Sequence, residues 1–320
     1  MVSAIARRDP QRIYVPNSGS NSVDIIDPRT YRVIRHFAVG ALPQHITPSY
    51  NLTRLYVTDD VGNALTPIDP RTGRPGRPLP VADPYNLYFT ADGRVAIVVA
   101  ERLHRLDFRS AKTFRLIRAV PVPCSGVNHL DVSADGRYAI ASCEFSGRLL
   151  KVDLYRRRVV RVLKLPRRFA IPQDVRASPD GRTFYVADLA AGGVWEVDPN
   201  AFKVRGFIRT GAGAHGLVVG RDAKVLYVAN RSEGTVSVIS FRTRRVIHKW
   251  RIPHGSPDMG GVSADGKVLW LSGRYSAEVY ALSTRSGRLL ARIPVGASPH
   301  GVCVWPQPGR HSLGHTGNMR

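Results

Sequence analysis

The sequence has few cysteines and no long hydrophobic run, and both shortages restrict what the protein can be. Three cysteines in 320 residues are too few for a disulfide framework, which agrees with a reducing compartment. No stretch approaches the roughly 18–20 continuous apolar residues that a membrane-spanning helix needs. The first eleven residues also lack the apolar core of a signal peptide. We therefore expect a cytoplasmic protein without a membrane span, unless translation starts upstream and encodes an export signal.

Acidic residues and lysine are scarce beside arginine. The chain has 24 Asp and Glu against 47 Lys and Arg, a formal net charge of +23, and all but seven of its cationic residues are arginine. A GC-rich bacterial genome would account for part of this excess. A polyanion-binding surface would account for the rest, because the guanidinium group matches phosphate and carboxylate geometry. Composition leaves both explanations open.

Helical periodicity is absent as well, and a repeat takes its place. A strand ending in a motif such as YVAN (227–230) recurs seven times at spacings of 41 to 45 residues. Three further short runs rich in Val and Ile accompany each copy, and an Asp-Gly turn ends one of them in four copies, as in SADG (263–266). Four strands in about 43 residues are typical of a propeller blade. The sequence therefore predicts an all-β fold, a seven-bladed β-propeller with four-stranded blades.

The order of the runs predicts how the ring closes. The chain begins on the second strand of blade one (13–17) and ends with HGVCVW (300–305), which has the pattern of an innermost strand. Pairing these two runs would remove the open sheet edge. We predict a lead-in at 1–11, a single propeller domain at 12–309 and a tail at 310–320. Because the tail is polar and Gly-rich, we expect it to be loose, the alternative being a return over the channel mouth.

Several short motifs connect these repeats to a known family. They are YVPN (14–17), YVTD (56–59), YVAD (185–188), YVAN (227–230), the IDP turns (26–28 and 68–70), SPDG (178–181) and PVGASPHGV (294–302). On these residues the whole chain resembles the YVTN-type, or YncE-like, β-propellers. The resemblance implies a seven-bladed ring but no single activity, since such proteins include binding modules, redox-enzyme domains and lyase- or lactonase-like enzymes.

Polar residues are expected at one end of the channel. Alternate loops of a four-stranded blade fall on opposite faces, so we define the mouth as the face with the loops that enter the innermost strands, and the underside as the other face. The rim pairs that these loops bring to the channel are Gln44–His45, Tyr85–Asn86, Asn128–His129, Gln173–Asp174, His215–Gly216, Asp258–Met259 and His300–Gly301. Because the innermost strands converge, these side chains can meet around a small ligand or a metal. The alternative is structural, since His-Gly belongs to the repeat.

No catalytic motif of the HExxH, paired CxxC or G-x-S-x-G type is present. The catalytic residues are therefore unknown. If the protein is an enzyme, His215, His300 and Asp258 are the candidates for general acid/base and metal-ligand roles. No cofactor is predicted, and a divalent metal ion stays open.

A second, weaker metal candidate lies in blade four. Cys124, His129 and Cys143 are expected near one another at the mouth, where two thiolates and an imidazole could hold a soft metal. Their spacings of five and fourteen residues match no standard metal motif, so two isolated small residues in loops are the alternative. Cys303 lies within a strand and is expected in the core.

The underside turns carry most of the cationic excess. The candidate polyanion-binding residues are Arg156, Arg157, Arg158, Arg242, Arg244 and Arg245. Such a basic face would attract nucleic acid through counterion release without reading its sequence. Aromatic residues for base stacking are sparse there, which argues against a dedicated single-strand reader, and a solvated arginine-rich surface is the alternative. Carboxylates outnumber arginines in the mouth loops, so we expect a near-neutral or acidic mouth.

These observations favour a monomeric, non-catalytic binding or scaffold propeller that presents its mouth to a small ligand or a protein partner. Two alternatives stay open. One is a lyase- or lactonase-like enzyme with a histidine and carboxylate site at the mouth, and the other is non-specific binding of nucleic acid or another polyanion by the underside.

Overall fold

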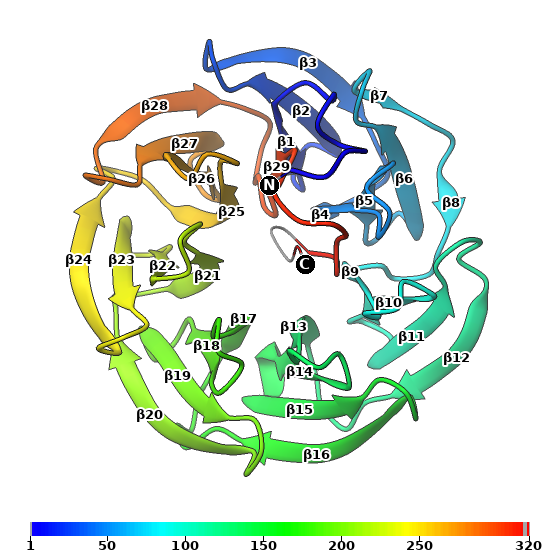
Figure 1. Ribbon diagram of the computed structural model, residues 1–320, viewed down its shortest axis with the longest axis vertical. Helices are drawn as coiled ribbons and strands as arrows, with labels where there is room; N and C mark the ends of the chain where they lie inside the picture. The colour runs from blue at the N-terminus through cyan, green and yellow to red at the C-terminus, as the bar shows by residue number, and fades with distance from the viewer. Residues whose placement is uncertain (1, 316–318, 320) are drawn as a thin grey trace.

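Seven antiparallel sheets surround a central channel in the computed structural model (Figure 1). The structure describes residues 2–315 and residue 319. The only helical element among them is the short 3-10 turn η1 (Glu144–Ser146), and none of these residues forms a helix that is long and apolar enough to cross a membrane. The predicted all-β, seven-bladed propeller is confirmed.

Each blade contains four strands in the order innermost, second, third and outer. The innermost strands are β29 (Cys303–Trp305), β4 (Pro43–Pro48), β9 (Asn86–Phe89), β13 (Val127–Val132), β17 (Pro172–Ala177), β21 (Ala214–Val219) and β25 (Pro257–Val262). The second strands are β1 (Arg12–Asn17), β5 (Leu55–Asp59), β10 (Val95–Ala100), β14 (Tyr138–Cys143), β18 (Phe184–Asp188), β22 (Val225–Asn230) and β26 (Val268–Gly273). The third strands are β2 (Ser22–Asp27), β6 (Ala64–Asp69), β11 (Arg105–Ser110), β15 (Arg148–Asp153), β19 (Gly193–Asp198), β23 (Thr235–Ser240) and β27 (Glu278–Ser283). The outer strands are β3 (Arg32–Ala38), β12 (Leu116–Pro121), β16 (Arg158–Lys164), β20 (Lys203–Arg209), β24 (Arg245–Arg251), β28 (Leu289–Pro294) and, in two pieces, β7 (Arg74–Pro75) with β8 (Leu79–Pro80).

The ring closes between the two ends of the chain. Strand β29 pairs antiparallel with β1, and Val304 lies opposite Ile13. The backbone N–H of His300 also donates to the carbonyl of Pro16 at 3.0 Å. Blade one therefore takes its innermost strand from the C-terminal region and its other strands from the N-terminal region, as the sequence predicts. This arrangement leaves no open edge between the first and last blades.

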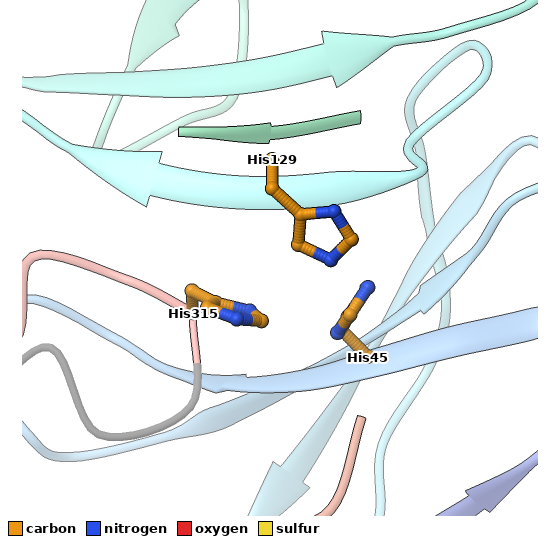
Figure 2. A group of neighbouring side chains, drawn as sticks. All are labelled: His45, His129 and His315. Carbon is orange, nitrogen blue, oxygen red and sulfur yellow. The ribbon is translucent and has the colours of Figure 1, made fainter. Parts of the chain in front are cut away.

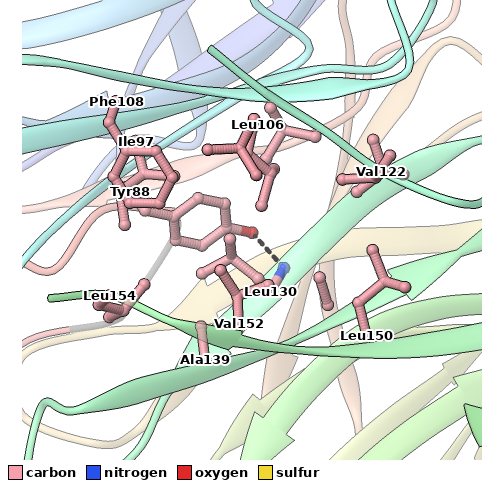
Figure 3. Packing of buried hydrophobic residues seen from close by; sticks show 14 of the residues in the cluster. Tyr88, Ile97, Leu106, Phe108, Val122, Leu130, Ala139, Leu150, Val152 and Leu154 are labelled. Carbon is pink, nitrogen blue, oxygen red and sulfur yellow. Dashed lines mark hydrogen bonds between the residues drawn. The ribbon is translucent and has the colours of Figure 1, made fainter. Parts of the chain in front are cut away.

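Apolar side chains fill the spaces between neighbouring blades. The largest cluster lies between blades three and four and is centred on the buried Tyr88 (Figure 3). Its ring packs among residues such as Ile97 and Leu106, and its hydroxyl accepts a hydrogen bond from the backbone N–H of Leu130 at 3.0 Å. A buried tyrosine hydroxyl needs such a partner. The bond therefore fixes the innermost strands of the two blades relative to each other, and with them the positions of the rim residues.

The chain beyond β29 turns back into the channel. In Figure 1 this red segment runs from β29 to the middle of the ring, toward β4 and β9. The N–H of Ser312 donates to the carbonyl of Tyr50 at 3.1 Å, and the N–H of Phe89 donates to the carbonyl of Leu313 at 3.0 Å. Tyr50 follows the underside end of β4, so the tail enters the channel from the underside.

The end of the described tail is buried against β9. The N–H of His315 donates to the carbonyl of Leu87 at 3.0 Å, and both Leu313 and His315 are at most 1 % exposed. The approach requires glycine at position 314, where φ is +95° and a Cβ atom would lie 2.3 Å from the Cα of Tyr88. The expectation of a loose tail is therefore wrong for these residues, because the inner edge of β9 offers backbone partners. The described residues of the tail also do not return over the mouth, and residues 316–318 and 320 of the predicted tail lie outside the part of the chain that the structure describes.

Candidate functional site

A β-bulge lies at five of the seven rim pairs. In β4 the pairing with β5 shifts register between Pro43 and Ile46, so Gln44 and His45 lie in the irregular stretch. The hydroxyl of Thr58 supports this bulge by accepting from the N–H of His45 at 3.0 Å. Equivalent shifts occur at the start of β13, β17, β21 and β25. Such bulges re-aim side chains and are frequent next to functional sites.

All of the predicted rim residues are buried in the structure. These are Gln44, His45, Tyr85, Asn86, Asn128, His129, Gln173, Asp174, His215, Asp258 and His300, and none is more than 7 % exposed. The two asparagines have structural partners, since Asn86 donates to the hydroxyl of Tyr88 at 3.1 Å and Asn128 donates to Glu144 at 3.0 Å. The histidines and aspartates instead gather in two groups inside the channel.

The first group consists of His45, His129 and His315 (Figure 2). The three rings come from β4, from β13 and from the tail, and they face a common space. Their centroids are 5.2 Å apart for His45 and His129, 4.9 Å for His45 and His315, and 5.2 Å for His129 and His315. One ring nitrogen of each lies within 4.8 Å of the others. Sequence reasoning missed His315, because the polar tail has no strand pattern that would place it in the channel.

The second group consists of His215, Asp258 and His300, which are the candidate acid/base residues. The Nδ1 atom of His215 lies 2.7 Å from Asp258 Oδ1, and the Nε2 atom of His300 lies 3.7 Å from Asp258 Oδ2. Arg231 also reaches Asp258, with Nη2 2.7 Å from Oδ1. Burial alone would raise the pKa of Asp258, but Arg231 and the two histidines hold it well below its usual value. The carboxylate is therefore ionised and already has a cationic partner.

The two groups are in contact and form one cluster. The rings of His45 and His300 are 4.7 Å apart between centroids, and those of His129 and His215 are 6.1 Å apart. Tyr85 packs edge-on against His45 at 5.6 Å. Half of the ten histidines of the chain therefore meet in this channel.

Burial determines the charge of this cluster. It lowers the pKa of all five imidazoles, which are His45, His129, His215, His300 and His315. Each ring is therefore neutral at neutral pH and keeps one nitrogen with a free lone pair. Neutral imidazole is the form that binds metal ions and accepts hydrogen bonds.

The mouth presents less negative charge than the sequence suggests. Burial raises the pKa of Asp59 to about 6, of Asp60 to about 7 and of Glu101 to about 8. Arg102 lies 2.9 Å from Asp83 and 3.6 Å from Asp60. Asp60 and Asp83 are therefore paired with Arg102, and Glu101 is largely protonated near neutral pH. Asp59 is buried and accepts a hydrogen bond from Thr66, so these carboxylates do not form an acidic surface.

The blade-four metal candidate is wrong. Cys124 and Cys143 form a disulfide with their Cα atoms 6.1 Å apart, so neither sulfur is available as a thiolate ligand beside His129. The bond joins the loop that enters β13 to the end of β14. Cys303 is free and buried, as predicted. Because disulfides are typical of oxidising compartments, the cysteine count no longer supports a reducing location, and the cytoplasmic expectation stays a prediction.

The candidate polyanion-binding arginines lie in turns of the underside and at the starts of outer strands. The side chains of Arg156 and Arg244 are 72 % and 58 % exposed. Their nearest carboxylates are distant, with Asp153 at 4.0 Å from Arg156 and Glu196 at 3.9 Å from Arg244. Exposed pairs of this length hold the cations only weakly. Binding of a polyanion by these residues stays a prediction.

Fold and channel together define a β-propeller with a histidine-rich channel. The chain belongs to the YNCE-like beta-propeller family, whose sequence profile matches residues 3–310. No curated protein matches the sequence.

Similar solved structures share the fold at low sequence identity. A functionally unknown protein from Desulfotomaculum acetoxidans DSM 771 is 15 % identical with a TM-score of 0.77, and the match covers 93 % of this chain and 99 % of that one. Hydrazine synthase from Kuenenia stuttgartiensis is 20 % identical with a TM-score of 0.68 over 80 % of this chain and 87 % of that one. Virginiamycin B lyase from Staphylococcus aureus is 16 % identical with a TM-score of 0.68 over 82 % of this chain and 88 % of that one. These likenesses show the fold and leave the activity open.

Proposed function

We propose that this protein is a non-catalytic binding propeller that takes a small ligand at the histidine-rich rim of its channel. The rim residues are too deeply buried for the surface of a protein partner to reach them, whereas a small ligand inside the channel contacts several blades at once. The carboxylate that a general base mechanism would use, Asp258, already contacts Arg231 and His215. Binding therefore accounts for the site better than catalysis does.

The observation that carries this proposal is a set of buried nitrogen atoms without hydrogen-bond partners. Within the described part of the chain, both ring nitrogens of His45, both of His129 and the Nδ1 atom of His300 lack a partner, as does the Nε2 atom of Gln173. Leaving one buried polar group unsatisfied costs about 1–3 kcal/mol. A native fold that keeps several such groups together is explained when a ligand satisfies them.

Native mass spectrometry of the protein as purified, combined with elemental analysis, tests the proposal. We expect a bound species on the wild-type protein that is lost or reduced in His300→Gln and retained in His248→Gln, an exposed histidine on β24. Gln variants at His45, His129, His215 and His300 that bind as the wild type does, and differ only in thermal stability, would refute the proposal. Absence of any bound species after purification and after incubation with metal salts would refute it too.

The second group of channel residues favours one other candidate, a lyase- or lactonase-like enzyme. A carboxylate 2.7 Å from an imidazole nitrogen is an arrangement that orients a general base, and His300 adds a second imidazole beside Asp258. The fold similarity to virginiamycin B lyase supports this candidate only as an analogy. A streptogramin B and a panel of sugar lactones are suitable substrates for the test. Turnover that is lost in His300→Ala, with the fold retained by circular dichroism, would establish the enzyme, whereas no turnover of either class would leave binding as the function.

A further inference from the structure

The C-terminal tail completes a set of three imidazoles in the channel. We propose that His45, His129 and His315 form a binding site for a divalent first-row transition-metal ion such as Zn²⁺ or Cu²⁺, and that the docked tail supplies the third ligand. This inference rests on the proposed function, since it names the small ligand of the channel.

The backbone brings the three ligands together from both sides of blade three. His45 stands on β4 of blade two and His129 on β13 of blade four. Blade three, between them, has the rim pair Tyr85–Asn86 and no histidine at this level. The tail pairs with the inner edge of its strand β9 and places His315 there instead. Blade three thus receives its imidazole from a segment more than 200 residues away in the sequence.

The spacing of the nitrogen atoms suits an ion after a small adjustment. The three candidate ligand atoms lie within 4.8 Å of one another. In a tetrahedral site with bonds of 2.0–2.1 Å, neighbouring ligand atoms are about 3.3 Å apart. Movements of about 1 Å at each ring, which small side-chain rotations supply, therefore close the site. Figure 2 shows the three rings around the space into which they would move.

The chemistry of the ligands selects the class of ion. Imidazole nitrogen suits Zn²⁺, Cu²⁺, Ni²⁺ and Co²⁺, whereas Mg²⁺ and Ca²⁺ require oxygen ligands. The sulfur atoms of Cys124 and Cys143 are excluded because they are bonded to each other. Among the described residues, both nitrogens of His45 and of His129 and the Nε2 atom of His315 have no hydrogen-bond partner. The Nε2 atom of His315 does lie near a carboxylate oxygen, Asp174 Oδ1 at 3.5 Å, which a bound cation would face as well.

Groups behind the ligands hold His315 in place. Its Nδ1 atom lies 3.4 Å from the Nδ2 atom of Asn86, and its Nε2 atom lies 3.5 Å from Asp174 Oδ1. The Asp174 carboxylate lies on the side of the ring that carries the candidate ligand atom Nε2, so it adds negative charge near a bound cation. Arg176 also contacts this carboxylate, with its Nη2 atom 3.7 Å from Asp174 Oδ2.

Metal binding and tail docking are linked by this geometry. An ion that binds only when His315 is in the channel stabilises the docked tail, and an ion concentration 100 times the dissociation constant lowers the undocked population about 100-fold. Conversely, removing the imidazole of His315 from the tail weakens binding of the ion. A purely structural cluster, in which the three rings pack edge-on without an ion, predicts neither effect.

The test uses the full-length protein after removal of metal with EDTA. Zn²⁺ and Co²⁺ are titrated by calorimetry and by the visible absorption of Co²⁺, with Mg²⁺ and Ca²⁺ as comparison ions, and tail docking is followed by hydrogen exchange at 311–315. We expect one tight Zn²⁺ site, at least about 100-fold weaker binding in His315→Gln and in His45→Gln, and slower tail exchange in wild type with Zn²⁺. His311→Gln, a change in the same tail, and His248→Gln, a change at an exposed histidine on β24, are the controls that should keep the affinity.

Each outcome supports or overturns the inference. Because the His315 position follows the closing strand, His315→Gln leaves the ring intact, and its melting temperature without metal checks this. Unchanged Zn²⁺ affinity in His315→Gln, or Zn²⁺ binding that leaves tail exchange unaltered, overturns the inference. Loss of Zn²⁺ binding in His300→Gln alone moves the ion to the second group and also overturns it. No metal binding together with a retained organic ligand overturns the metal site but keeps the proposed function, and no ligand of any kind overturns both.

Discussion

Removing the disulfide between Cys124 and Cys143 should destabilise the propeller by about 3 kcal/mol. The bond closes a chain segment with a sequence separation of 19 residues, and the chain-entropy model gives about 3 kcal/mol for a loop of this length. The unfolding entropy of a 320-residue chain is about 0.7 kcal/mol/K. A loss of this size should therefore lower the melting temperature by about 5 °C.

Equilibrium unfolding in urea, with and without a reductant, measures this contribution. The reductant should lower the wild-type midpoint, whereas the Cys124→Ala/Cys143→Ala protein should unfold near the reduced wild-type midpoint in both conditions. Cys303→Ala is the control, since it removes a buried free thiol and should leave the effect of the reductant unchanged.

Counting thiols provides an independent check. Labelling of the denatured, unreduced wild-type protein should find one free thiol, that of Cys303. Three free thiols, or a wild-type midpoint that does not respond to the reductant, would show that the disulfide reasoning is wrong. One free thiol in protein taken directly from its host would also favour an oxidising compartment over the cytoplasmic expectation.

Three other predictions follow from the charged groups. Burial raises the pKa of Glu101 from 4.5 to about 8, so the folded protein keeps a proton that the unfolded chain has lost. The free energy of unfolding of the wild-type protein should therefore fall as the pH rises from about 5 to 8, and Glu101 should contribute at most about 1.4 kcal/mol per pH unit to this fall. In urea titrations, Glu101→Gln should reduce the dependence of the unfolding free energy on pH. Equal pH dependence in the wild type and the variant would contradict the raised pKa of Glu101. Arg231→Gln should lower the free energy of unfolding by about 3–5 kcal/mol because it leaves the buried Asp258 without its cation. Adding Asp258→Asn should restore much of that stability. A double-mutant cycle without such a restoration would contradict the ion pair. Glutamate at all three positions of 156–158 should weaken binding of duplex DNA at low salt and reduce the slope of log affinity against log salt by about 0.9 for each lost phosphate contact; if the wild type does not bind at low salt, the polyanion hypothesis is wrong.

The fold could be predicted from the sequence because the strand and turn patterns that define it are local and recur in every blade. Each blade has the same strand and turn pattern, as in 224–266, and the Asp-Gly turns mark the same hairpin in four blades. A repeat of this period constrains the number of blades and the identity of the closing strand. The split outer strand of blade two, β7 with β8, departs from a regular blade at a segment rich in Pro and Gly, and the innermost strand of blade one, β29, is only three residues long.

Part of the candidate site could also be predicted from the sequence. The rim pairs follow from the position of each loop in the repeat, and the structure brings His215, Asp258 and His300 together at one end of the channel. Their roles stay predictions. The sequence could not distinguish an open polar rim from a buried cluster, because burial at the axis depends on side chains from all of the blades.

The sequence by itself thus determined the strands, the seven blades, the closure and which loop residues of the repeat reach the channel, since period-2 patterns and turn residues act over short distances. Only the tertiary structure decided that Cys124 and Cys143 are bonded and that His315 lies beside His45. The disulfide depends on how a loop folds against the end of β14, and the tail docks because β9 has a free inner edge inside the channel. Contacts of this kind join segments with no common pattern, and for that reason the ligand-binding part of the channel appears only when the ring is closed.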